Sequence, residues 1–68
     1  MGKRASRSRR LRLGLEETGR ALAAARAGFD ETADEDLLEY YLYEIDALGA
    51  KHTYLLRQLK ALEKEEGL

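Results

Sequence analysis

The stretch Thr32–Glu65, TADEDLLEYYLYEIDALGAKHTYLLRQLKALEKE, decides the fold of this chain. Its apolar residues recur in alternating steps of three and four, which places them on one face of a helix with 3.6 residues per turn. This main stripe consists of Leu38, Tyr41, Ile45, Leu48, His52, Leu55, Leu59 and Leu62. The spacing predicts one long amphipathic helix over about residues 33–65.

A second column of small and apolar residues runs beside the main stripe and consists of Leu42, Gly49 and Leu56. The apolar face is therefore wider than a two-position coiled-coil seam and suits a helix with more than one neighbour. Thr32 and Glu35 have the spacing of a capping box, which would start the helix. Gly67 is a plausible end for it.

A shorter helix is predicted ahead of this one, over about residues 9–27. Its apolar stripe consists of Leu11, Leu15, Leu22, Ala25 and Phe29. Gly28 would cap its C-terminus, and residues 29–31 would form a short connection that makes the two helices antiparallel neighbours. We therefore expect an all-α fold, a two-helix hairpin within one domain over residues 9–68. Residues 1–8 are expected to form a disordered basic arm.

The composition limits what the chain can be. A two-helix chain of 68 residues buries little apolar surface, so a monomer should be marginally stable, and dimerisation would complete a bundle. The chain has no cysteine, which is compatible with a cytoplasmic location. No apolar run approaches the roughly 20 residues of a transmembrane helix.

Charge is distributed unevenly along the chain. Residues 1–26 carry eight basic and two acidic side chains, a net charge of +6. Residues 27–68 carry four basic and eleven acidic side chains, a net charge of −7. Such a split suggests head-to-tail self-association, pairing within the chain, or an anionic partner.

The C-terminal part of the long helix is the predicted protein-interaction surface. The first helix is expected to be shorter than the second, so it would leave this part uncovered, and an uncovered apolar stripe is usually an interaction surface. The residues of this predicted surface are Tyr54, Leu55, Leu56, Arg57, Leu59 and Leu62. The leading hypothesis is a non-enzymatic adaptor that presents this face to itself, as a homodimer, or to another protein.

The basic N-terminus supports an alternative function. Its six cationic residues could neutralise phosphates, in a binding mode that depends strongly on salt. They are Lys3, Arg4, Arg7, Arg9, Arg10 and Arg12. Without a groove-reading motif, such nucleic-acid binding should be non-specific. The same residues could instead form a solubilising tail, fold back onto the acidic helix or contact a membrane surface.

Catalytic and metal-binding motifs are not found in the sequence, so we expect neither an enzyme nor a cofactor. The single histidine, His52, lies on the apolar stripe, and no residue three or four positions away is acidic. It is more typical of the edge of a core, or of a register or pH-sensitive position at a dimer seam. The acidic cluster between Asp30 and Asp46 is more typical of a solvated helix face.

The segment from Asp36 to Lys60 resembles a family of short bacterial proteins of unknown function, the DUF2508 or YaaL-like proteins. The matching features are Asp36-Leu37-Leu38, Tyr43-Glu44, Ala47, Tyr54-Leu55-Leu56-Arg57 and Lys60. The resemblance covers about half of the chain and extends weakly to residues 25–30. It implies a small, helical, cytoplasmic bacterial protein and transfers no activity.

Overall fold

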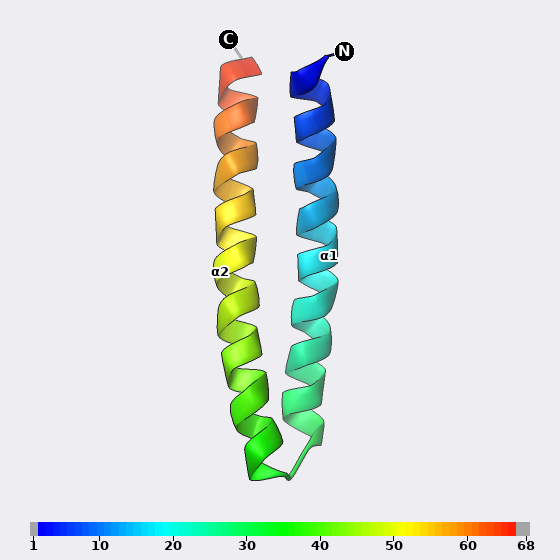
Figure 1. Ribbon diagram of the computed structural model, residues 1–68, viewed down its shortest axis with the longest axis vertical. Helices are drawn as coiled ribbons and strands as arrows, with labels where there is room; N and C mark the ends of the chain where they lie inside the picture. The colour runs from blue at the N-terminus through cyan, green and yellow to red at the C-terminus, as the bar shows by residue number, and fades with distance from the viewer. Residues whose placement is uncertain (1, 67–68) are drawn as a thin grey trace.

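Two antiparallel helices form a slender rod (Figure 1). The computed structural model describes residues 2–66, apart from the side chain of residue 66. Helix α1 spans Lys3–Glu31 and helix α2 spans Glu35–Glu66. The rod measures 50 × 15 × 13 Å, and α1 starts beside the end of α2, at what we call the open end (Figure 1). The predicted all-α helical hairpin is confirmed.

The turn between the helices, residues 32–34, is held by hydrogen bonds. The Thr32 N–H donates to the carbonyl of Gly28 at 3.1 Å and closes α1. Asp34 caps α2, because its Oδ1 accepts the N–H groups of Asp36 at 2.9 Å and Leu37 at 3.3 Å. The predicted capping box is wrong: the Thr32 hydroxyl oxygen instead accepts the N–H of Asp34 at 3.1 Å.

Helix α1 is longer than the sequence predicts at both ends. It begins at Lys3 rather than near residue 9, so the basic segment expected to be disordered is helical. Arginine is a good helix former, and α2 runs beside this segment and supplies partners for its side chains. At the other end α1 continues through Gly28 to Glu31, so residues 29–31 are helical rather than a connection. Gly67, the expected end of α2, lies outside the described residues.

Two glycines of α1 allow α2 to approach closely. At Gly14, an added Cβ would lie 3.2 Å from Leu55 Cδ1, and at Gly28 it would overlap the ring of Tyr41. These two contacts also fix the register of the two helices. Because the helices are antiparallel, each step forward along α1 matches one step back along α2. Gly19 is therefore level with Ala50, next to Gly49.

The core between the helices is thin. Among the described side chains only four are buried, and they come from both helices: Thr18, Ala25, Leu59 and Leu62. The remaining residues of the main stripe are half-buried. A single pair of helices can cover only one side of each, so much apolar surface stays in contact with water.

Candidate interaction surfaces

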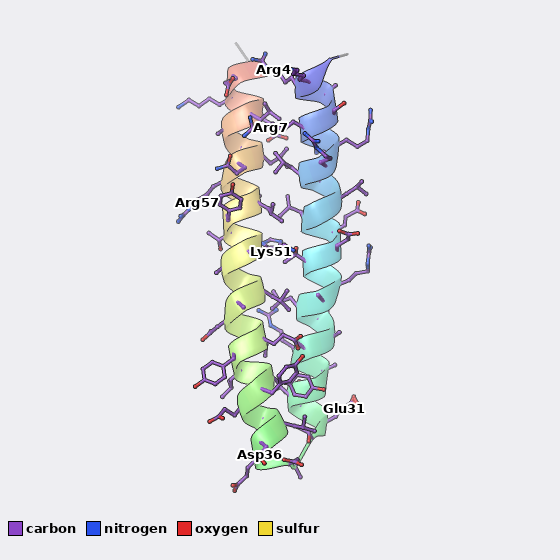
Figure 2. All side chains as sticks on the ribbon, viewed as in Figure 1. Arg4, Arg7, Glu31, Asp36, Lys51 and Arg57 are labelled. Carbon is purple, nitrogen blue, oxygen red and sulfur yellow. The ribbon has the colours of Figure 1, made fainter. Side chains whose placement is uncertain are left out.

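The predicted interaction surface of α2 is divided between the core and the exterior. Leu59 and Leu62 are only 6% and 5% exposed, and Leu55 is half-buried against Gly14. In this register Leu55 and Leu59 are level with residues 14 and 10, inside the first helix that the sequence predicts, and Leu62 is level with residue 7, in the part by which α1 is longer. The first helix was expected to leave all three leucines bare. Tyr54 is 60% exposed, and Arg57 lies on the side of α2 away from α1 (Figure 2).

The second column, which we call the outer column, is only partly covered in the hairpin. It consists of Leu42, Gly49 and Leu56, which are spaced seven residues apart and therefore lie in line along α2. Leu42 is 52% exposed, Leu56 is half-buried, and a Cβ at Gly49 would have no neighbour within 4 Å. Gly19 of α1 lies beside Gly49, offset by one residue, and a Cβ added there would also have no neighbour within 4 Å. The middle of this face therefore carries no side chain at Gly49 and Gly19 and has room for one.

Charged side chains accompany the outer column along one edge, which we call the outer flank. Its residues lie within about 60° of Leu42 on the helical wheel. Toward the turn the flank is acidic, with Glu35, Glu39 and Asp46, and toward the open end it is basic, with Arg57, Lys60 and Lys64. All six are exposed, and none forms an ion pair with another described residue. Charge summed over whole segments of the sequence hides this reversal, which becomes visible only along one face of the helix.

The basic residues predicted as nucleic-acid contacts divide into two groups. Three reach across to α2 at the open end, where Figure 2 places Arg4 and Arg7 between the helices. Arg4 and Arg12 form ion pairs with Glu65 at 3.2 Å and Glu63 at 2.9 Å, and Arg7 donates a hydrogen bond to Gln58 at 3.3 Å. Lys3, Arg9 and Arg10 are exposed and form no ion pair with another described residue.

A shallow hollow of about 340 Å³ lies between the helices on the side opposite the outer column. It is lined by Ala21, Ala24, Ala25, Tyr40, Tyr41 and Glu44. Tyr40 donates a hydrogen bond from its hydroxyl to Glu44 Oε2 at 3.0 Å, and this bond, together with the negative charge of Glu44, raises the pKa of Tyr40. No nucleophile accompanies the tyrosine among these lining residues.

His52 lies half-buried on the main stripe of α2, as the sequence indicates. The described part of the chain brings together no group of three histidine, aspartate or glutamate side chains that could hold a metal ion. Within residues 2–66 neither helix is long and apolar enough to cross a membrane.

Comparison with known proteins yields no match: neither a family model nor a curated protein nor a solved structure is similar enough to this chain to report.

Proposed function

We propose that this chain is a non-enzymatic helical interaction protein whose outer column binds the helices of a second copy or of another protein. The observation that carries the proposal is the 52% exposure of Leu42 in a hairpin with only four buried residues among those whose side chains the structure describes. A partner that removes uncovered apolar surface from water stabilises a hairpin whose own core is thin. Membership in the DUF2508 family and a cytoplasmic location belong to this proposal and rest on the sequence.

The proposed surface replaces most of the one predicted from sequence. Leu55, Leu59 and Leu62 are used within the hairpin, whereas Leu56 lies in the outer column and remains partly accessible. Arg57 borders the same face, on the outer flank. The binding surface is thus shifted around α2 and extended toward the turn, with Leu42 as its most exposed apolar residue.

Substituting Leu42 by aspartate tests this proposal, with Leu13→Asp as the matched control. Both leucines are 52% exposed, but Leu13 lies on α1, on the side away from α2. In sedimentation equilibrium we expect wild type and Leu13→Asp to exceed the 7.7 kDa of one chain as concentration rises, and Leu42→Asp to remain at one chain. Circular dichroism should show similar helicity for both variants. A wild-type chain that stays at one-chain mass, with both variants indistinguishable from it, would contradict self-association through the outer column and leave only another protein as its partner.

A second candidate function is non-specific binding of nucleic acid at the open end. It is favoured by the exposed Lys3, Arg9 and Arg10, which α2 does not neutralise. Arg4, Arg7 and Arg12 are already engaged by α2, so the cationic surface available to phosphates is about half of the predicted one.

A further inference from the structure

We infer that the partner on the outer column is a second copy of this chain, with the two α2 helices antiparallel and crossing near Gly49. This inference rests on the proposed function and specifies its partner and geometry. The observations behind it are the charge reversal of the outer flank and the symmetric placement of the outer column about Gly49.

The outer column reads the same in both directions from Gly49. Leu42 lies seven residues before it and Leu56 seven residues after it. In an antiparallel pair of α2 helices that cross there, Leu42 of each copy is level with Leu56 of the other. The open space at Gly49, where an added Cβ would have no neighbour within 4 Å, allows the two backbones to approach at the crossing point.

The charges of the outer flank match this register. Glu39 lies ten residues before Gly49 and Lys60 eleven after it, while Glu35 lies fourteen before and Lys64 fifteen after. Antiparallel pairing therefore sets Glu39 of one copy beside Lys60 of the other, and Glu35 beside Lys64. Each pair occurs twice in the dimer because a twofold axis repeats every contact. A parallel pair would instead set acidic residues beside acidic residues and basic beside basic.

Contacts within the hairpin keep the flank available for this pairing. The acidic Glu63 and Glu65 near the open end form ion pairs with Arg12 and Arg4 of α1. The basic residues of the same helical turns, Lys60 and Lys64, are thereby left on the outer side without an acidic described partner. Near the open end, the described acidic side chains of α2 are thus paired with α1, and the basic side chains of the outer flank are available to a partner.

The size of the rod allows a contact that approaches a standard protein interface in area. The rod is 50 Å long and 15 Å wide, so full side-by-side contact would cover on the order of 750 Å² per copy. A standard protein interface covers about 800 Å² per partner. An antiparallel register centred on Gly49 makes the two rods overlap along their length, because Gly49 lies near the middle of α2.

Disulfide formation between two single-cysteine variants tests the orientation. The chain contains no cysteine, so Glu39→Cys and Lys60→Cys each introduce a unique thiol. The two variants, one isotopically labelled, are mixed in equal amounts in a glutathione buffer and the disulfide products are weighed by mass spectrometry. We expect the mixed 39–60 product to exceed clearly the proportion of about half that random pairing gives.

Two outcomes would overturn the inference in different ways. Predominance of the 39–39 and 60–60 products would show a parallel pair and refute the orientation while the proposed function stands. Disulfides no more abundant than in the same variants carrying Leu42→Asp would refute the second copy as the partner, while binding of another protein's helices by the outer column would still stand.

Charge reversal gives an independent test without cysteine. Glu39→Lys and Lys60→Glu should each weaken self-association about tenfold, because each places like charges together twice in the dimer. Combining the two in one chain should restore the wild-type dissociation constant to within about threefold, because every pair is again of opposite sign. Both positions lie outside the first and last turns of α2, so the helix dipole is little affected. Additive weakening in the double variant would overturn the inference.

Discussion

At the scale of single residues, Thr18 departs most clearly from what packing favours. It is 2% exposed in the middle of α1, and its hydroxyl has no hydrogen-bond partner among the described residues. A buried hydroxyl without a partner loses its hydrogen bonds to water and gains nothing in return. Thr18 therefore occupies a core position at a cost to the stability of the hairpin.

Replacing Thr18 by valine should raise the free energy of unfolding by about 1 kcal/mol, because valine keeps the branched shape and removes the unpaired hydroxyl. Urea denaturation followed by circular dichroism, at one fixed protein concentration, would measure the change. Thr18→Ser is the control, since it keeps the hydroxyl and loses the methyl group, and it should lower stability. A valine variant less stable than wild type would mean that the hydroxyl has a partner.

At the scale of elements, the start of α2 depends on one side chain. Asp34 accepts two backbone N–H groups of the first turn, which would otherwise lack partners within the helix. The helix dipole also favours its negative charge at this end. The acidic residues that follow, Glu35 and Asp36, also interact favourably with the helix dipole, but they do not replace the hydrogen bonds of the cap.

Asp34→Ala should therefore lower the free energy of unfolding by about 1 kcal/mol, the usual effect of removing an N-cap. Asp30→Ala is the matched control, because it removes the same charge near the C-terminal end of α1, where the dipole disfavours a carboxylate. Its stability should be unchanged or slightly higher. Equal destabilisation by both substitutions would show that net charge, not capping, is responsible.

At the scale of the whole molecule, the hairpin is a rod with opposite charges at its two ends. Residues 3–12 at the open end of α1 carry six cations and no acid, whereas residues 30–39 around the turn carry six acids and no cation. This polarity favours antiparallel over parallel alignment of two copies. The second candidate function, binding of phosphates, is supported by the exposed cations at this open end.

That candidate predicts a specific salt dependence. Replacing Lys3, Arg9 and Arg10 by glutamine should reduce the log–log salt slope of duplex DNA or RNA binding by up to about three, one for each lost phosphate contact. Fluorescence anisotropy over a salt series would measure it, with Arg20→Gln and Arg26→Gln as controls outside the segment. Equal slopes for wild type and the triple variant would contradict this function. Truncation is unsuitable, because residues 3–12 cover part of α2.

The sequence by itself determined the two helices and their antiparallel arrangement, because heptad-like spacing and a short connection leave a chain of this size few alternatives. It also identified the outer column, since the positions of Leu42, Gly49 and Leu56 follow from helical periodicity alone. Only the tertiary structure decided how far α1 extends, because residues 3–8 lie beside the C-terminal part of α2, where Arg4 pairs with Glu65, 61 positions away. That extension covers Leu62, and packing of the two helices also buries Leu59, so the tertiary contacts decided which apolar face is left for a partner.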